Sequence, residues 1–313
     1  MTASGRGKRD VSGLLLLDKP PGMTSNAALQ RVKRLFGARK AGHTGSLDPI
    51  ATGMLPLCLG EATKLSAFLL KAEKKYRVTA RFGIRTDTGD AAGKAVAETA
   101  QRPQGRSQLE AVLNRFIGET EQVPPMYSAL KHKGKRLYEL ARAGQTVERA
   151  PRRIRIRLFE LEEYSPAESV FLVACGGGVY IRTLIEDVAE AIGSLAHVCA
   201  LRRLGVAPFE ESGMVTMDRI EAGAAKGYSG LDALLLPADA AVPALPAVRL
   251  SASESFYLQR GNPVAAGRGV RPGPVRLYAD AQGFIGIGEA TVDGQVAPRR
   301  LLKPQGEHLL RGA

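Results

Sequence analysis

The sequence predicts an α+β fold: a mixed, mainly antiparallel sheet flanked by helices, followed by a small β-barrel at the C-terminus. Stretches of alternating apolar and polar residues indicate half-buried strands, and amphipathic stretches between them indicate helices. After about residue 246 the chain changes to short strands separated by Gly and Pro turns, which suits a small barrel. The 313 residues, 44% of them hydrophobic, are enough for one large domain and one small domain.

The N-terminal segments are expected to form a tail, a strand and a helix. Residues 1–11 are polar, Gly-rich and basic, which predicts a disordered tail. Residues 13–19 (GLLLLDK) predict a short buried strand that ends at a Pro-Pro-Gly turn. The helix expected over 27–37 follows Thr-Ser-Asn, any of which can cap it, and it closes at Gly37.

The central segments are expected to supply the rest of the sheet and its helices. In order, the sequence predicts a Gly-rich loop at 41–53, a strand, turn and helix over 53–74, a strand at 75–83, and helices at 107–118 and 179–193. A strand over 152–164 alternates strictly at its start. Its two faces follow from the period of two: Ile154, Ile156 and Leu158 inward, and Arg153, Arg155 and Arg157 outward.

Charge and cysteine content narrow the class of protein. A net charge of +13 favours a polyanionic partner, most commonly nucleic acid, although a basic protein without such a partner is the alternative. The three cysteines are odd in number and far apart, which argues against a disulfide framework and a zinc knuckle: Cys58, Cys175 and Cys199. The apolar run at 14–17 is too short to span a bilayer, and no signal-peptide pattern follows Met1. We therefore expect a cytoplasmic protein.

One isolated carboxylate stands out in the Gly-rich loop. Between Gly42 and Leu59, Asp48 is the only side chain that is charged at neutral pH. Pro49 keeps Asp48 out of the helical region and removes a backbone donor beside it. A positioned carboxylate can act as a nucleophile or a general base. An Asp-Pro pair can equally be a simple turn, and the local residues do not decide between the two.

The loop belongs to a longer pattern. Residues 42–64 (GHTGSLDPIATGMLPLCLGEATK) closely resemble the signature of the TruB family of bacterial tRNA pseudouridine-55 synthases. LLLLDKPPGMTS precedes it, and KKYRV, TDTGD, VPPMYSALKHKGKRLYELARAG, GVYIRTL and LRR follow in the family's order. These motifs cover most of residues 12–210, which is far more specific than one short motif. The C-terminal barrel resembles the family's PUA or PUA-like domain.

The resemblance implies a pseudouridine synthase fold and an activity. It implies an isomerase that converts uridine 55 in the T-loop of tRNA to pseudouridine, with no metal and no cofactor. Asp48 matches the family's catalytic aspartate. Whether it attacks the ribose, attacks the base or removes a ribose proton stays open. The uridine must leave its stack, because the glycosidic bond and the ring are otherwise shielded.

The resemblance also assigns five residues to the substrate pocket. Tyr76 matches the aromatic residue that stacks on the base and can take up the carbon-5 proton. Tyr180 and Arg182 match substrate-binding and aspartate-pairing positions, so that Arg182 would keep Asp48 ionised and aimed. Leu201 matches the apolar wall of the uracil pocket, and His43 matches the histidine that fills the space left by the flipped base. Taken singly, each also has an ordinary structural explanation in core packing, an ion pair or a loop.

Basic side chains are candidates for a phosphate-facing surface, although each can be an ordinary solvated charge: Lys19, Lys64, Lys74, Lys75, Arg77, Lys131, Lys133, Lys135 and Arg136. The outward arginines of 152–164 carry the same alternatives. We expect a catalytic domain over 12–245 with a thumb-like RNA-binding insertion at 124–152, and a PUA-like RNA-binding domain over 246–313. GGGV at 176–179 departs from the Lys-Gly-Thr-like run of many family members. The departure removes a basic or hydroxyl side chain that could contact RNA, so it bears on RNA affinity more than on the catalysed reaction.

Other classes of protein fit less well. A non-catalytic tRNA-binding or tRNA-folding module would not need Asp48, which this chain retains. A zinc deaminase needs His and Cys ligands near a P-C-x-x-C run, and the sequence has no such spacing. A SAM-dependent methyltransferase needs a Gly-rich turn after its first strand, whereas GGG at 176–178 comes late. We expect a monomer that has no obligate protein partner and does not contact a membrane.

Overall fold

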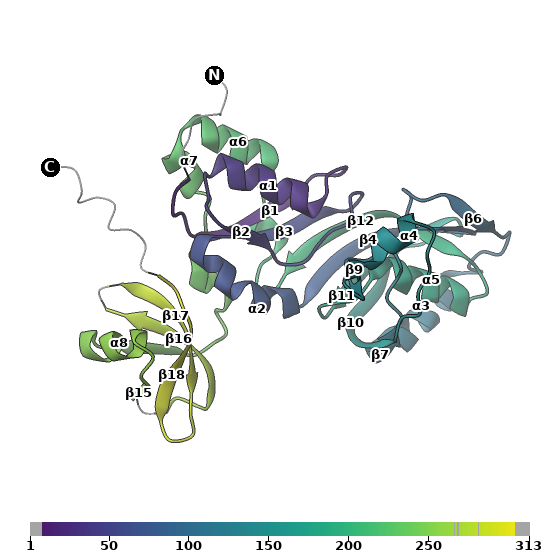
Figure 1. The fold of residues 1–313 in the computed structure, drawn as a ribbon. Coiled ribbons are helices and arrows are strands. Elements are labelled where there is room, and N and C mark those ends of the chain that lie inside the picture. The colour runs from purple at the N-terminus through teal and green to yellow at the C-terminus, as the bar shows by residue number, and fades with distance from the viewer. Residues whose placement is uncertain (1–7, 266, 268, 281, 304–313) are drawn as a thin grey trace. The chain divides into compact units, whose positions relative to one another are not determined.

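The computed structural model describes residues 8–265, 267, 269–280 and 282–303 (Figure 1). These residues form two compact units. The first contains residues 8–47, 55–70 and 212–303, and the second contains residues 48–54 and 71–211. No helix among the described residues is both long and apolar enough to cross a membrane.

The first unit begins with the predicted strand and helix. Strand β1 (Gly13–Lys19) is buried and pairs in parallel with β13 (Val215–Thr216), while β2 (Ala41–His43) pairs antiparallel with β3 (Thr52–Leu59). Helix α1 (Ser25–Leu35) is capped by the Thr24 hydroxyl, which accepts a hydrogen bond from the Ala27 amide at 3.1 Å. The segment is continued by η1 (Gly60–Leu65) and α2 (Ser66–Lys71).

The predicted tail is ordered in the part that the structure describes. Residues 1–7 lie outside the described residues. Arg9 forms a β-bridge with Ala38 and donates a hydrogen bond to Asp232 Oδ2 at 2.7 Å, and Val11 is buried. The expected disorder therefore does not extend to Arg9 and Val11.

The C-terminal part of the first unit forms a curled five-stranded sheet in the described residues (Figure 1). Its order is β14-β16-β17-β18-β15, with α8 (Ala252–Gln259) packed against it. The strands are β14 (Ala247–Leu250), β15 (Val264–Ala265), β16 (Gly273–Ala279), β17 (Gly283–Ala290) and β18 (Gln295–Leu301). Aliphatic side chains, among them Leu250, Leu277 and Val296, fill its core. The expected small barrel-like sheet is confirmed.

Residues 211–241, which precede this sheet, are mostly helical. They contain η3 (Glu211–Gly213), α6 (Met217–Ala225), α7 (Tyr228–Asp232) and η4 (Ala238–Ala241). Gly223 and Gly230 let α6 and α7 approach closely, because a Cβ at Gly230 would lie 2.6 Å from the Gly223 carbonyl oxygen. Composition alone does not reveal this packing.

The second unit contains an antiparallel run of long strands in the order β12-β4-β11-β10-β7. These are β4 (Lys74–Phe82), β7 (Gly118–Gln122), β10 (Arg152–Glu163), β11 (Glu168–Cys175) and β12 (Ala196–Val206). Helix α5 (Ile181–Ala191) packs against β4 and β12, and α3 (Arg106–Leu113), followed by η2 (Asn114–Phe116), packs against β10. The start of β3 joins β12 in parallel through Thr52 and Gly53, so the sheet is mixed and mainly antiparallel, as predicted.

The two faces of this sheet differ. On β4, Lys74, Tyr76 and Val78 are buried, and Lys75 and Arg77 between them are exposed. The exposed face carries ion pairs, including Arg77 with Glu162 and Arg157 with Glu73. Of the three arginines predicted to face outward from residues 152–164, at least Arg157 thus pairs with a protein carboxylate.

Strand β10 departs from the predicted alternation. Ile154 and Ile156 are buried as expected, but an irregularity in the pairing with β11 follows Ile156. Beyond it Phe159 and Leu161 are buried, while Leu158 is only partly so. The prediction for Leu158 is therefore wrong, because a shift of one residue exchanges the two faces of a strand.

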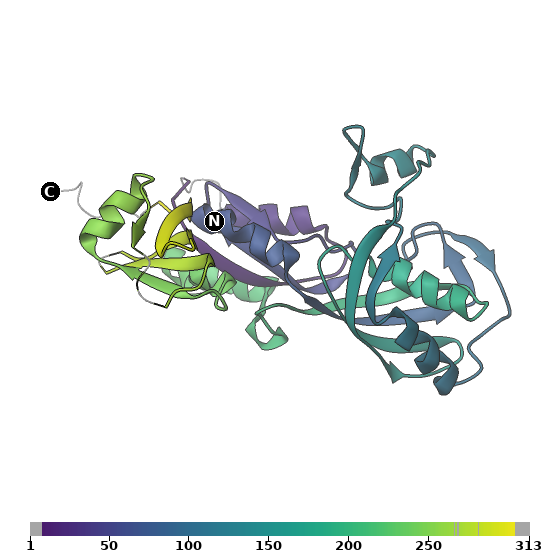
Figure 2. The same ribbon diagram turned by 90° about the horizontal axis from the view of Figure 1, so that it is seen from below.

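Shorter elements complete the unit. Strands β5 (Ile84–Thr86) and β6 (Ala95–Glu98) form one hairpin, and β8 (Lys131–His132) and β9 (Lys135–Arg136) form another beside α4 (Leu137–Arg142). In Figure 2 this second hairpin and α4 stand away from the sheet.

Candidate active site

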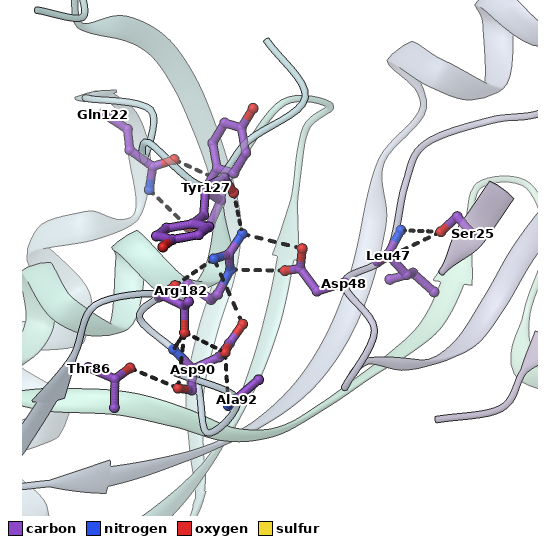
Figure 3. A network of polar contacts seen from close by, with 11 residues as sticks. Ser25, Leu47, Asp48, Thr86, Asp90, Ala92, Gln122, Tyr127 and Arg182 are labelled. Atoms are coloured by element: carbon purple, nitrogen blue, oxygen red, sulfur yellow. Dashed lines mark hydrogen bonds and ion pairs between the residues drawn. The ribbon is translucent and has the colours of Figure 1, made fainter. Parts of the chain in front are cut away.

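A buried arginine holds the carboxylate that the sequence singles out. Arg182, near the start of α5, contacts Asp48 with two nitrogens: Nε lies 2.9 Å from Oδ2, and Nη2 donates to Oδ1 at 3.3 Å (Figure 3). Such a fork fixes the plane of the carboxylate as well as its position. The Arg182 side chain is 6% exposed, whereas that of Asp48 is 37% exposed. Arg182 therefore fixes the orientation of the Asp48 carboxylate, which stays partly exposed to solvent.

The rest of the guanidinium is fixed by backbone carbonyls. Nη1 donates to the Thr88 carbonyl at 2.5 Å, and Nη2 donates to the Tyr127 carbonyl at 2.8 Å. Thr88 lies between β5 and β6, and Tyr127 lies in the stretch that leads toward the β8–β9 hairpin. Arg182 thereby connects two loops of the second unit, those of Thr88 and Tyr127, to the Asp48 carboxylate.

A second carboxylate supports this arginine. Asp90 is 5% exposed, and its Oδ2 lies 3.8 Å from Arg182 Nη1. Asp90 Oδ1 accepts hydrogen bonds from the Thr88 hydroxyl at 2.7 Å and from the Ala92 amide at 3.1 Å, and the Thr86 hydroxyl donates to its carbonyl (Figure 3). The TDTGD run is thus a rigid turn that presents a carbonyl and a carboxylate to Arg182.

The start of α5 is held by a buried amide. Gln122, 4% exposed, accepts from the Tyr180 amide at 2.9 Å through Oε1 and donates to the Tyr180 carbonyl at 3.1 Å through Nε2. Tyr180 is the N-cap residue of α5, so this clamp sets the position of Arg182 two residues later. Burial raises the pKa of the Tyr180 phenol, which keeps it protonated and able to donate a hydrogen bond.

Tyr76 and Leu201 share the buried face of the sheet. Tyr76 on β4 pairs with Arg203 on β12, and Val78 pairs with Leu201, so these four residues point to the same side. Tyr76 and Leu201 are each 7% exposed. Burial raises the pKa of the Tyr76 phenol, and Arg203 opposes that shift. An aromatic ring and an aliphatic wall therefore lie together in the same unit as Asp48.

The sequence prediction did not include several residues of this arrangement. Thr88, Asp90, Gln122 and Arg203 carry no assigned role there, although TDTGD was part of the recognised pattern. Asp90, like Asp48, is a carboxylate in a Gly-containing loop, but it lacks the isolation that singled out Asp48, because Asp87 lies in the same loop. Gln122 gives no such signal, because its partner is 58 residues away in the sequence.

His43 and two of the basic candidates lie in the first unit. His43 is the last residue of β2 and pairs with Leu57. Lys64 is held by Glu61 Oε2 at 2.6 Å and by the Leu301 carbonyl at 2.7 Å. Lys19 is wholly buried, and its ammonium donates to the carbonyls of Pro20 and Met23 at 2.8 and 2.7 Å. The prediction that Lys19 faces phosphate is wrong, because its charge stabilises the Pro-Pro-Gly turn from inside.

The prediction that Lys74 faces phosphate is also wrong, because its side chain is buried on β4. Four other basic candidates, Lys131, Lys133, Lys135 and Arg136, lie in an exposed hairpin. Lys131 on β8 pairs with Arg136 on β9, and Lys133 lies in the turn with Gly134. Lys133 and Gly134 have φ angles of 47° and 87°, as a two-residue hairpin turn requires. Lys131, Lys133 and Arg136 are all exposed, so a phosphate can reach them. Among the described residues, no group of three or more His, Cys, Asp or Glu side chains could hold a metal ion.

The second unit thus holds a carboxylate that a buried arginine fixes, together with a buried tyrosine. The chain belongs to the TruB family of pseudouridylate synthases. The family's N-terminal domain model matches residues 33–181, and its two C-terminal domain models match residues 182–243 and 246–302. The protein is accordingly a pseudouridine synthase, an isomerase.

Curated relatives are similar over nearly the whole chain. The tRNA pseudouridine synthase B of Coxiella burnetii (strain Dugway 5J108-111) is 51% identical over 95% of this chain and 96% of its own length. The protein of the same name from Stutzerimonas stutzeri (strain A1501) is 49% identical over 96% of this chain and 98% of its own length.

Solved structures share the fold. A chain in the crystal structure of a Cbf5-Nop10-Gar1 complex matches with a TM-score of 0.70 and 24% identity, over 94% of this chain and 84% of that chain. A chain in the structure of an H/ACA RNP bound to a substrate RNA containing 2′-deoxyuridine matches with a TM-score of 0.71 and 23% identity, over 93% and 85% of the two chains. At this identity the likeness supports the pseudouridine synthase fold.

Proposed function

We propose that the protein converts uridine 55 in the T-loop of tRNA to pseudouridine, and that Asp48 is the catalytic residue. The observation that carries the proposal is the Asp48–Arg182 fork, in which a partly exposed carboxylate is held by a buried cation. The curated relatives named tRNA pseudouridine synthase B, at about half identity over nearly the whole chain, support tRNA as the substrate.

The reaction is an isomerisation, so atoms balance without a co-substrate. The bond between ribose carbon 1′ and base nitrogen 1 breaks, a bond between carbon 1′ and carbon 5 forms, and carbon 5 loses a proton while nitrogen 1 gains one. Asp48 assists cleavage by attack or as a general base, and Arg182 keeps the carboxylate charged and oriented. In the proposal the Tyr76 phenol, which burial keeps protonated, takes up the carbon-5 proton as it passes its own proton on to solvent.

The pocket residues offset the cost of removing the base from its stack. Unstacking costs a few kcal/mol, and stacking of a base on an aromatic ring returns about 1–3 kcal/mol. In the proposal Tyr76 provides that ring, Leu201 provides the apolar wall, and Tyr180 donates a hydrogen bond to the base. His43 occupies the space that the base vacates in the T-loop.

Binding of the remainder of the tRNA is assigned to exposed basic surfaces. We propose that the insertion at 124–152 closes on the T-arm through Lys131, Lys133 and Arg136, which are exposed. Residues 246–313 act as a PUA-like RNA-binding domain, next to a catalytic domain over 12–245. The protein acts as a monomer in the cytoplasm.

The test is a pseudouridine map of unmodified tRNA after incubation with each variant. We expect wild type to modify position 55, and Asp48→Ala to give no product while its tRNA dissociation constant stays within about threefold. Asp10→Ala is the matched control, because Asp10 is 59% exposed and also pairs with an arginine, Arg39, at 3.2 Å. Product from Asp48→Ala would overturn the role of Asp48.

The same map decides against the second candidate function. A non-catalytic tRNA-binding module would bind tRNA with wild-type affinity and leave every uridine unchanged. The family membership and the Asp48–Arg182 pair favour the enzyme.

A further inference from the structure

Arg203 is a buried cation beside Tyr76 that the proposed reaction has not used. Its side chain is 1% exposed and is among the largest fully buried side chains of the described residues. Burial of a charge is costly unless hydrogen bonds and partners compensate it. The contacts that compensate the buried charge of Arg203 therefore indicate the role of this residue.

Those contacts join two parts of the pocket. Arg203 Nε donates to the Met54 carbonyl at 2.6 Å, and the Arg203 side chain also hydrogen-bonds the Tyr76 phenol oxygen. Met54 is the last residue of the segment that starts at Asp48, and Tyr76 lies opposite Arg203 on the neighbouring strand. One rigid guanidinium thus spans from the base-stacking ring to the end of the Asp48 loop.

The backbone around Arg203 is packed as closely as its side chain. Gly53 pairs with Arg203 across β3 and β12, and a Cβ at Gly53 would lie 2.3 Å from the Arg203 carbonyl oxygen. The Asp48–Met54 segment therefore rests directly on Arg203, with no side chain between at Gly53. A change in the Arg203 side chain has little room to be absorbed by a shift of the loop.

The charge of Arg203 also acts on its neighbours. Lys74, 6% exposed on the same face of β4, has its pKa lowered to about 8 by burial and by the Arg203 charge. Arg203 counteracts the rise that burial causes in the pKa of Tyr76. The positive charge of the guanidinium thus favours the ionised form of the Tyr76 phenol, against the effect of burial.

We propose that Arg203 is a positioning residue that holds the Tyr76 phenol and the Asp48 loop in one geometry. Its catalytic meaning rests on the proposed function, whereas the contact with Tyr76 does not. Arg203 acts through Tyr76 and Met54 and does not itself touch the uridine.

The test compares Arg203→Lys with Arg202→Lys, the same change at the next residue. Arg202 is the matched control, because its side chain is 33% exposed and its Nε donates to Glu211 at 2.8 Å. We expect Arg203→Lys to lower the single-turnover rate at saturating enzyme about tenfold, as the loss of one charge-assisted hydrogen bond predicts. Its tRNA dissociation constant should stay within about twofold, and Arg202→Lys should change neither. An unchanged rate, or a loss of affinity that equals the loss of rate, would overturn the proposal.

A spectroscopic measurement tests the contact without activity. The chain has eight tyrosines, and in protein labelled with 3-fluorotyrosine the ¹⁹F resonance missing from Tyr76→Phe belongs to Tyr76. We expect Arg203→Lys to shift that resonance and to leave the others in place. No shift, or a shift of the whole set, would show that Arg203 only packs the core. If wild type makes no pseudouridine, the proposed function fails while this measurement still decides the contact.

A second variant covers the case in which Arg203→Lys does not fold. Tyr76→Phe removes the phenol oxygen and leaves Arg203 in place. In ¹⁵N spectra it should move the Nε–H resonance of one slowly exchanging arginine. If no such resonance moves, Arg203 does not hold Tyr76.

Discussion

Replacing Arg182 with Lys keeps the positive charge and removes the fork that aims Asp48. The guanidinium contacts both Asp48 oxygens and donates to the carbonyls of Thr88 and Tyr127. An ammonium is a point charge that cannot present two parallel N–H groups to a carboxylate. The substitution therefore separates the charge of this residue from its geometry.

The expected magnitude follows from the contacts that Lys cannot keep. A hydrogen bond to a charged group contributes about 1.5–3 kcal/mol, and each buried carbonyl that loses its donor costs about 1–3 kcal/mol. If about 3 kcal/mol of this is lost in the transition state, the turnover rate falls roughly 100-fold. Affinity for tRNA should change little, because Arg182 is 6% exposed and cannot reach phosphate.

The assay is single-turnover pseudouridine formation on unmodified tRNA, with the tRNA dissociation constant measured beside it. Arg81→Lys is the control, since Arg81 pairs with Glu168 at 3.4 Å on the exposed face and both side chains are about half exposed. Exposed pairs contribute about 0–1 kcal/mol, so this variant should resemble wild type. A rate for Arg182→Lys within threefold of wild type would show that charge alone suffices and that the fork is dispensable.

Three further predictions concern pH, salt and backbone. Burial raises the pKa of Glu186 from 4.5 to about 6, so its ionised form opposes folding progressively between pH 4.5 and 6 and fully above that. Glu186→Gln should raise the free energy of unfolding by about 1 kcal/mol at pH 7.5, a value reduced for partial exposure, and should not change it below pH 4.5. Denaturant unfolding at both pH values measures this difference, and an equal gain at both would contradict the prediction. The second prediction removes three exposed charges of the hairpin together, by Lys131→Ala, Lys133→Ala and Arg136→Ala. The slope of log Kd against log salt concentration should fall by about 2–3, and the rate at saturating tRNA should not change. An unchanged slope would exclude phosphate contact at the hairpin. Gly53→Ala should destabilise by about 3 kcal/mol or more, because Gly53 has φ of 94° and no room for a Cβ, whereas Gly134→Ala, with φ of 87° and open space, should cost about 1 kcal/mol; equal thermal shifts would refute the steric argument.

Regular elements were predictable because their signals are local. The period of two placed β4 and the start of β10, and the Thr24 cap and Gly37 bounded α1 to within two residues. The failure at Leu158 has a definite cause, since an irregularity in the ladder depends on the partner strand β11 and leaves no mark in the alternation of β10 itself.

The Asp48–Arg182 pair was predictable only through the family pattern. The two residues are 134 positions apart, and no local rule brings them together. Local chemistry left Asp48 undecided between a turn and a reactive carboxylate. In the structure both descriptions hold, because Asp48 accepts the Ala51 amide at 3.0 Å through its carbonyl while its side chain faces Arg182.

Charge in the sequence does not separate cations that bind the substrate from cations that build the protein. Lys19 and Lys133 are the same residue type in the sequence, yet Lys19 is wholly buried and Lys133 is exposed. The difference lies in their neighbours. The carbonyls of Pro20 and Met23 need a donor, and Lys19 is within reach to supply it.

The same reasoning applies to the adjacent pair Arg202 and Arg203. Because successive residues of a strand face opposite sides, one of the two must lie on the buried face of β12. The buried one then requires polar partners, and the Met54 carbonyl and the Tyr76 phenol meet that requirement. Two consecutive arginines on a central strand therefore predict one surface charge and one internal cation, and Leu201, two residues before Arg203 on the same face, identifies which is which.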